Sequence, residues 1–175
     1  LVSIFVLIAG TAYWFLYNPE VTDLVNLSAQ ISENKIKSGD YTTIYFRYEN
    51  NSDTKLLTPT LSIHLPEGFI LDKAEPNDMF DKTARAFKLN SLPSGHSGVA
   101  QISGWSFGPP DKEEKITTEL TYQQNDRAFK ETKNSTTYLI HRGSILETKI
   151  EAPQIILAQG ETAIKITLKN TGTIT

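Results

Sequence analysis

The feature that most limits how this chain can fold is a polar–apolar alternation that begins after Pro19. In a representative stretch, 25–31, the apolar face carries Val25, Leu27, Ala29 and Ile31. A period of two residues is the repeat of a half-buried β-strand, and no stretch after Pro19 keeps the 3.6-residue period of a helix. The alternation therefore predicts an all-β fold for residues 19–142.

Turn-forming residues separate the alternating runs at intervals suited to two packed sheets. Glycine, proline, asparagine and aspartate gather at 38–40, 50–53, 66–68, 109–112 and 125–127. About eight short strands in roughly 120 residues are typical of an antiparallel β-sandwich with Greek-key connections. We interpret 75–83 as an irregular loop. The residues expected to face inward are Ile44, Phe46, Tyr48, Leu61, Ile63, Leu65, Ile116, Thr118, Leu120 and Tyr122.

Residues 1–17 differ from the rest because they contain no charged side chain. A helix of this length spans roughly 26 Å, slightly less than the ~30 Å hydrocarbon core of a bilayer. Tyr13, Trp14 and Tyr17 close the run, as in the aromatic belt at a membrane surface. We expect a transmembrane helix over residues 1–18 that contacts membrane lipid through residues 1–17.

The distribution of charge places the sandwich on the outer side of that membrane. No Lys or Arg occurs before Lys35, whereas positive charge normally gathers on the cytoplasmic flank. The sequence thus predicts a single-pass membrane protein with an extracellular or periplasmic domain. Two alternatives stay open. One is a cleaved signal peptide, although the small-residue trio 10–12 lies inside the apolar run; the other is a buried core helix, although the run is apolar on every face.

The chain is also similar to itself over one domain length. The residues Ile44, Phe46, Tyr48 and Asn50 lie 120 positions before Ile164, Ile166, Leu168 and Asn170. A spacing of this size corresponds to a whole sandwich and not to the shorter repeat of a solenoid. We expect residues 143–175 to begin a second, truncated repeat; the alternative is chance likeness between two amphipathic strands.

A motif in the first half resembles a known family. The run GDYTTIYFRYENN at 39–51, followed by LPEGF at 65–69, resembles the repeated Ig-like surface-protein domain of bacteria and archaea. In that family one strand ends in Asn-x-Gly and the next in Leu-Pro-x-Gly. Here Ser52 stands in place of the first glycine, while the second copy keeps the form at 170–172. The resemblance covers roughly residues 24–142, and it implies an Ig-like sandwich that serves as a stalk or adhesion module.

The corner at 65–69 also has a physical explanation. We expect Leu65 to close the end of the core and Pro66 to end strand pairing, because proline has no N–H to donate. Gly68 is expected to adopt a positive φ. The preceding Asn50 and Asn51 favour a tight turn because asparagine bonds its own main chain.

Composition argues against several classes of function. The chain has no cysteine, which excludes disulfides, cysteine-ligated zinc and thiol catalysis. Its net charge is −3 and it has no basic run, so we do not expect nucleic acid as a partner. We predict no catalytic, cofactor-binding or metal-binding residues, and no cofactor.

The histidines and serines lack the spacing that chemistry requires. His64, His96 and His141 are far apart in sequence and none has a partner at metal-ligand spacing. The run SGHSG at 94–98 has the wrong register for a nucleophile elbow, and we interpret it as a surface loop. Glu113 and Glu114 read as part of an exposed turn.

Acidic and aromatic residues leave two questions open. The carboxylates Asp72, Glu75, Asp78 and Asp81 could hold calcium, although interspersed lysines favour a solvated loop. Trp105 and Phe107 alternate onto one face, which we interpret as core, with an aromatic platform for a sugar or protein as the alternative. Glycosylation sequons begin at Asn26, Asn50 and Asn134.

The resulting hypothesis is a non-enzymatic, membrane-anchored extracellular structural or adhesion module, a stalk of tandem Ig-like domains. The junction at 141–153 is not Gly/Ser-rich, which favours a stiff connection. The alternatives are a ligand-binding or sensory ectodomain for carbohydrate or protein, and the anchor region of a larger surface enzyme whose catalytic domain follows Thr175.

Overall fold

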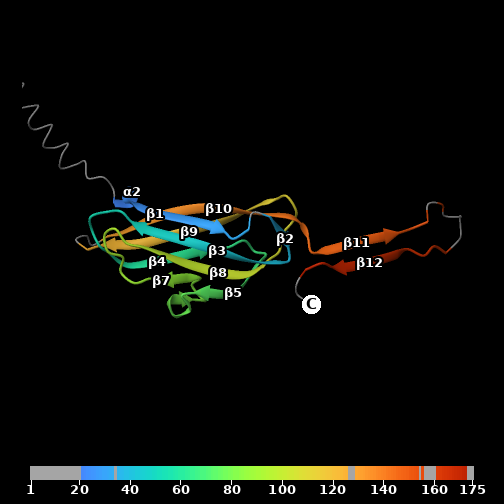
Figure 1. Cartoon of the computed structure of the whole chain (residues 1–175), viewed down its shortest axis with the longest axis horizontal. Coiled ribbons are helices and arrows are strands. Elements are labelled where there is room, and N and C mark those ends of the chain that lie inside the picture. Colours follow the sequence, from blue (N-terminus) through green and yellow to red (C-terminus); the bar gives the residue numbers. More distant parts are fainter. Residues whose placement is uncertain (1–20, 34, 126–128, 154, 156–160, 173–175) are drawn as a thin grey trace, which may run out of the picture.

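The computed structural model of the chain describes residues 21–33, 35–125, 129–153, 155 and 161–172 (Figure 1). Within these residues, no helix has the length and apolar character needed to cross a membrane. The expected transmembrane helix, residues 1–18, lies outside the described residues and stays a prediction.

The described chain is built almost entirely of β-strands. A four-stranded sheet has the order β1 (Val25–Ile31), β3 (Asp40–Asn50), β8 (Ser97–Ser106) and β5 (Phe69–Glu75). A six-stranded sheet has the order β2 (Ile36–Ser38), β10 (Lys130–Ser144), β9 (Glu113–Gln124), β4 (Leu56–His64), β7 (Ala86–Lys88) and β6 (Phe80–Asp81). A two-stranded sheet pairs β11 (Leu146–Glu151) with β12 (Lys165–Asn170). The short helical turns are α2 (Val21–Leu24) and η1 (Asn77–Met79).

The two larger sheets form a sandwich whose chain passes repeatedly between layers. Among the described strands, β2 and β10 pair in parallel and the other pairs are antiparallel. Neighbours such as β3 and β8 are distant in sequence, so most of the hydrogen bonding is non-local. The all-β prediction is confirmed.

One hydrophobic core fills the space between the two sheets. The four-stranded sheet contributes Val25, Ile44, Phe46, Ala100 and Ile102. The six-stranded sheet contributes Leu56, Leu61, Ile63, Phe87, Ile116, Leu120, Tyr122 and Leu139. The alternation read from the sequence holds best along β9, where Ile116, Thr118, Leu120 and Tyr122 are fully buried. Because each inward side chain removes apolar surface from water, this double layer supplies the main stabilisation of the domain.

The Leu-Pro-x-Gly corner turns the chain from one sheet to the other, as expected, but its glycine acts differently. β4 ends at His64 before Pro66, and Leu65 packs against the core edge. Gly68 is not one of the glycines with positive φ. A Cβ at Gly68 would lie 1.8 Å from the carbonyl oxygen of Phe107, whose amide donates to the Gly68 carbonyl at 2.9 Å. Close approach of two backbones, and not a left-handed conformation, therefore requires this glycine.

Two boundaries also differ from expectation. The segment 75–83 is not an irregular loop throughout, because it contains η1 and the strand β6. Phe80 of β6 packs on Phe87 of β7 with ring centroids 4.7 Å apart, which orders this segment. At the other end, β10 continues to Ser144, two residues past the expected domain end at 142.

The strand pair β11–β12 extends away from the sandwich (Figure 1). Its apolar side chains are largely exposed: Leu146 at 56%, Ile150 at 64%, Ile166 at 60% and Leu168 at 67%. An isolated two-stranded ribbon is at best marginally stable in water, and a contiguous apolar face usually marks a surface that another element covers.

Candidate functional site

The outer face of the four-stranded sheet carries a group of aromatic side chains, and Trp105 is one of them. In β8 the inward positions belong to Ile102, Gly104 and Ser106, so Trp105 points outward and is only half-buried. The interpretation of Trp105 as a core residue is therefore wrong. Its ring meets that of Tyr41 edge to face, with centroids 5.2 Å apart and an interplanar angle of 77°.

A hollow of about 320 Å³ opens beside this pair, which we call the aromatic socket. Its lining residues are Gly39, Ile70, Trp105, Phe107 and Ile145. Ile70 is 55% exposed and Phe107 43% exposed, so the socket presents hydrocarbon and aromatic surface to solvent. Such a patch is typical of a contact site for another apolar group.

A tyrosine–carboxylate pair, Tyr41 and Asp72, lies next to Trp105 at the edge of the socket. The Tyr41 hydroxyl donates to Asp72 Oδ2 at 2.9 Å. Burial raises the pKa of Tyr41, and the hydrogen bond to Asp72 and the charge of Asp72 raise it further. The pair thus fixes the orientation of the Tyr41 ring, which in turn supports Trp105.

Ile145 connects the socket to the strand pair β11–β12. Its amide donates to the Ser38 carbonyl at 3.1 Å, and its own carbonyl accepts from the amide of Thr171 at 2.7 Å. Gly39 has φ +101°, and a Cβ there would lie 2.4 Å from Ile145 Cδ1. The Ile145 side chain therefore occupies space that only a glycine leaves free, and it fixes the ribbon to the end of the sandwich.

The opposite end of the sandwich is held by a polar cluster around Thr22. The Tyr122 hydroxyl donates to Thr22 Oγ1 at 3.3 Å, and Thr22 Oγ1 donates to Glu131 Oε2 at 3.2 Å. Lys133 Nζ donates to the Thr22 carbonyl at 2.9 Å. Burial raises the pKa of Tyr122 to about 12, offset by the bond to Thr22 and increased by Glu131. The segment that follows the expected anchor is thus pinned to β9 and β10.

Two buried residues, Ser106 and His141, and the partly buried Glu114 are arranged in the order of a nucleophile, a base and a carboxylate. Ser106 Oγ lies 3.0 Å from His141 Nε2, and His141 Nδ1 lies 3.6 Å from Glu114 Oε2. Ser106 and His141 have no exposed surface, so no substrate reaches the hydroxyl in this conformation. Nδ1 and Oε2 find no hydrogen-bond partner among the described residues. The cluster resembles a catalytic triad only in the order of its three residues. Because these residues belong to β8, β9 and β10, their contacts connect the three strands.

Sequence reasoning missed this cluster for an identifiable reason. Glu114 was expected in an exposed turn, but it is the second residue of β9 and its Oε2 is buried. His141 lies two residues after the buried Leu139, so strand alternation alone would have placed it inward. The separation of Ser106 from His141 in sequence concealed their contact.

The remaining histidines and carboxylates do not converge. His64 and His96 are exposed at separate places, and among the described residues no three His, Asp or Glu side chains could share a metal ion. The acidic residues of 72–81 have different partners. Glu75 accepts from Gln101 Nε2 at 2.6 Å, and Asp81 Oδ2 accepts from Lys88 Nζ at 3.2 Å.

Asp81 organises its own turn. Its Oδ1 accepts the amides of Thr83 at 3.0 Å and Ala84 at 3.1 Å. The bond to the Ala84 amide and the bond to Lys88 lower the pKa of Asp81. Asp78 and Asp81 both line a shallow depression together with Lys88 and Asn90, so a lysine side chain lies among these oxygens. These carboxylates serve local turns and sheet edges, and they do not form one oxygen cage.

The first part of the SGHSG run is a surface turn, as expected, while its last two residues, Ser97 and Gly98, begin β8. Gly95 has φ +70°, and its amide donates to the Asn50 carbonyl at 2.7 Å. Ser94 Oγ donates to the Ser52 carbonyl at 2.6 Å. Asn50 itself is fully buried, so the sequon that begins there offers no accessible acceptor, whereas Asn26 and Asn134 are exposed.

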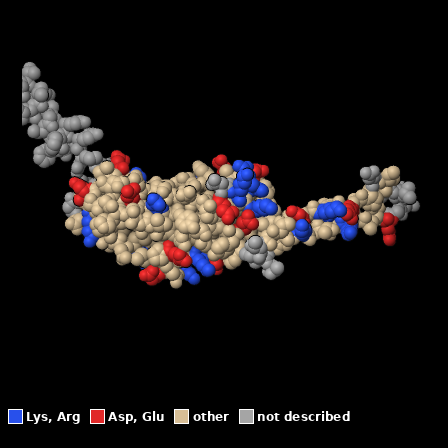
Figure 2. All heavy atoms as spheres, viewed as in Figure 1, with Lys and Arg blue, Asp and Glu red and all other residues tan. Residues whose placement is uncertain are grey.

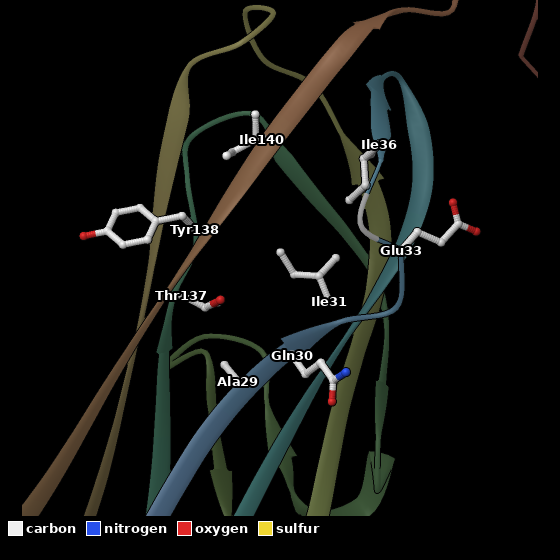
Figure 3. A pocket seen from close by; sticks show the side chains of 8 residues that line it. All are labelled: Ala29, Gln30, Ile31, Glu33, Ile36, Thr137, Tyr138 and Ile140. Atoms are coloured by element: carbon white, nitrogen blue, oxygen red, sulfur yellow. The ribbon is translucent and has the colours of Figure 1, made fainter.

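A second hollow, of about 240 Å³, lies where β1 parts from β2 and β10. Figure 3 shows Ile31 and Ile36 directed into it, while the side chains of Glu33 and Tyr138 point away. Among its described lining residues Glu33 is the sole carboxylate, so it contains no paired acid and base. Figure 2 shows acidic and basic side chains interspersed over the viewed face, without a large field of one sign.

Comparisons with known proteins leave the family open. No family model matches the sequence, and no curated protein matches it. The structure is similar to BslA, a bacterial hydrophobin, with TM-score 0.46 and 14% identity, covering 67% of this chain and 95% of that one. It is similar to the GAE domain of yeast GGA1, with TM-score 0.45 and 17% identity, covering 70% and 95%. It is also similar to the Vibrio cholerae VesB protease, with TM-score 0.42 and 14% identity, covering 72% and 34%. Likenesses this distant carry no functional argument.

Proposed function

We propose that this chain is the membrane-proximal part of a non-enzymatic surface stalk, in which tandem Ig-like sandwiches project from an anchor at residues 1–17. The observation that carries the proposal is that β11–β12 repeats the pairing of β1–β3. In the first pair Val25 lies opposite Asn50 and Ala29 opposite Phe46. In the second pair Leu146 lies opposite Asn170 and Ile150 opposite Ile166.

The hydrogen bonds at the ends of the two pairs match as well. The amide of Asn51 donates to the Leu24 carbonyl at 2.9 Å, and the amide of Thr171, 120 residues later, donates to the Ile145 carbonyl at 2.7 Å. Asn50 Oδ1 accepts the amide two residues on, that of Ser52, at 3.1 Å. Asn170 Oδ1 likewise accepts the amide of Gly172, at 2.9 Å. The shared register and the shared closing turn support true repetition over chance likeness of two amphipathic strands.

Strand order supports an Ig-like arrangement of the first module. In an Ig constant-type sandwich one sheet has the order A-B-E-D and the other contains C-F-G. Here β1, β3, β8 and β5 stand in the places of the first sheet, and β4, β9 and β10 in those of the second. There are two departures: β2 is added beside β10, in parallel, and the pair β6–β7 is added beside β4.

Both ends of the first module favour a stiff stalk. At one end Thr22 is bonded to β9 and β10, and at the other Ile145 is wedged against Gly39. A spacer keeps its two ends apart only if the connections between its domains resist bending. Short connections with packed side chains resist bending better than Gly/Ser-rich linkers.

Small-angle scattering of the full-length protein in detergent tests this function. We expect an elongated particle, whose length grows by one module for each added repeat. A compact particle would contradict the stalk. Deletion of residues 1–17 should release the protein from the membrane fraction into the soluble one, and retention in the membrane would contradict the anchor.

The aromatic socket favours a second candidate, a ligand-binding ectodomain. Exposed aromatic rings beside a carboxylate, here Trp105, Phe107 and Asp72, are suited to an apolar or carbohydrate ligand. With Trp14 replaced by Phe, Trp105 is the sole indole of the 175 residues, so its fluorescence reports on the socket. Saturable quenching of that fluorescence by an oligosaccharide panel, lost in Phe107→Ser, would favour this candidate over the stalk.

A further inference from the structure

We infer that Thr22 and Gln124 form an intramolecular ester cross-link, with Glu131 as the base that promotes it. The link is a covalent modification made by the folded chain itself, and it joins the segment before β1 to β9. Its chemistry is independent of the stalk, whereas its role rests on the proposed function. In a stalk, a pull on the anchor would pass directly into β9 and would not peel β1 from the edge of its sheet.

The side chain of Gln124 lies where the strand pattern calls for an apolar residue. It occupies the last inward position of β9, after Leu120 and Tyr122, and is 1% exposed. A buried amide costs free energy unless hydrogen-bond partners satisfy it. Here Gln124 Nε2 donates to Glu131 Oε1. The amide is therefore kept out of bulk water and in contact with a carboxylate.

The same carboxylate also holds a hydroxyl. Glu131 Oε2 accepts from Thr22 Oγ1 at 3.2 Å, although Thr22 lies 109 residues earlier in the sequence. The Tyr122 hydroxyl lies 3.3 Å from each of these two oxygens. Lys133 Nζ donates to the Thr22 carbonyl at 2.9 Å, which holds the backbone of Thr22 in place. A hydroxyl and an amide thus meet at the two oxygens of one base.

This arrangement suits acyl transfer within the chain. Glu131 Oε2 takes the proton of Thr22 Oγ1, and Oγ1 attacks the side-chain carbonyl carbon of Gln124. The bond from that carbon to Nε2 breaks, and Nε2 takes the proton from Glu131 and leaves as ammonia. The new bond from Oγ1 to the carbon remains as an ester. One ammonia is lost, no oxidant or cofactor is required, and holding both groups at one base makes the reaction unimolecular.

Mass spectrometry under denaturing conditions tests the cross-link. The full-length protein, purified in detergent, should be lighter than its sequence requires by the mass of one ammonia. After digestion with trypsin, the peptide that contains Thr22 and ends at Lys35 should be recovered joined to the peptide 116–127, which contains Gln124. Hydroxylamine should separate the two peptides, because it cleaves esters far faster than amides.

Matched variants locate the reacting groups. Thr22→Val and Gln124→Glu each remove one partner at nearly constant volume, and both proteins should have the full mass of their sequences. Glu131→Gln removes the base and should lower the linked fraction about a hundredfold. Thr22→Ser keeps the hydroxyl and should keep the link. Gln123→Glu is the control, because residue 123 lies on the opposite face of β9, and it should keep the link as well.

The mass of the unsubstituted protein decides first, so a variant that fails to fold leaves the test intact. Full mass and two separate peptides in that protein overturn the inference. An ammonia deficit that persists in Thr22→Val arises elsewhere in the chain and overturns it as well. The stalk is tested separately by scattering: a compact particle with the linked peptides removes the stalk and keeps the cross-link, whereas an elongated particle of full mass does the reverse.

Discussion

The strand pairs β1–β3 and β11–β12 have the same register but very different surroundings. In the first pair Val25, Ile44 and Phe46 are fully buried beneath the six-stranded sheet. In the second pair the corresponding Leu146 is 56% exposed and Ile166 is 60% exposed, as is Ile164 just before β12. The comparison teaches that the alternating pattern specifies the pairing of strands locally, while burial depends on a second sheet that faces them.

The largest expected difference follows directly from this contrast. Phe46→Ala should destabilise the first module by about 3–5 kcal/mol, since it removes a fully buried ring and leaves a cavity. Ile166→Ala, at the equivalent position, should change stability by no more than about 0.5 kcal/mol. Urea unfolding of the chain ending at Thr175 measures both. A cost at Ile166 equal to that at Phe46 would show that the ribbon is covered, and the contrast would fail.

Replacing the equivalent asparagines, Asn50 and Asn170, should also cost more stability in the first pair than in the second. The difference should be smaller than that between Phe46 and Ile166. Asn50 is fully buried, and its Nδ2 donates to the carbonyls of Thr54 at 2.8 Å and Leu92 at 3.1 Å. Asn50→Ala should cost about 2–3 kcal/mol, because it leaves buried groups without partners. Asn170→Ala, which loses an exposed turn bond, should cost at most about 1 kcal/mol.

Urea unfolding of the same chain also measures the stability of the Asn50→Ala and Asn170→Ala variants. Asn50→Asp is the informative control, because the carboxylate keeps the acceptor for Ser52 but loses the donors. A cost for the Asp variant well below that of the Ala variant would mean that the donor bonds to Thr54 and Leu92 contribute little, against the account given.

The end of the first module around Thr22 should lose stability at alkaline pH. Burial raises the pKa of Tyr122 to about 12, so the folded state holds this proton more tightly than the unfolded chain, whose tyrosine titrates near 10. The stabilisation is complete below pH 10 and is lost as pH rises through about 12. The loss should be on the order of 2 kcal/mol.

Tyr122→Phe should remove the part of the alkaline loss that Tyr122 causes, while Tyr138→Phe should leave it, because Tyr138 is 51% exposed. Stability measured by urea unfolding between pH 9 and 12 makes the comparison. Equal pH profiles for the Tyr122→Phe variant and the unsubstituted protein would mean that the Thr22 end is not held by a buried hydroxyl.

The accuracy of the sequence-based predictions follows the physics of burial. Strand alternation along β9 was predicted correctly at Ile116, Leu120 and Tyr122, since a half-buried strand leaves its period in the sequence. Trp105 was misplaced because Gly104 and Ser106 fill the inward positions of β8, and small residues give no apolar signal. Contacts between distant strands leave no local pattern at all.

The aromatic socket and the Ser106–His141 contact illustrate that last limit. Ile70 and Trp105 lie opposite each other only because β5 pairs with β8, and a single sequence contains no record of that pairing. The role of Gly68 was likewise hidden, because close approach of the Phe107 carbonyl and a positive φ both demand glycine. The anchor, the tandem array and the surface location stay predictions.

The smallest expected effect distinguishes two ways in which the ribbon β11–β12 could be held on the sandwich. One is the packing of Ile145 against Gly39, and the other is the positive φ of a glycine. Gly39 and Gly143 both have positive φ, +101° and +111°, so alanine at either should cost about 1 kcal/mol from backbone strain. Only at Gly39 would the new methyl group meet Ile145, at 2.4 Å from Cδ1, whereas at Gly143 no described atom lies within 4 Å. Gly39→Ala should therefore also displace Ile145, and Gly143→Ala should not.

Hydrogen exchange resolves this difference better than global stability does. The amides of Ile145 and Thr171 donate to the carbonyls of Ser38 and Ile145, so their protection reports directly on the joint. Gly39→Ala should raise the exchange rates of both amides, while Gly143→Ala should leave the rate at Thr171 unchanged. Equal acceleration by both variants would mean that φ strain, and not the packing of Ile145, keeps the ribbon in place, and the stiffness of the stalk would then need another source.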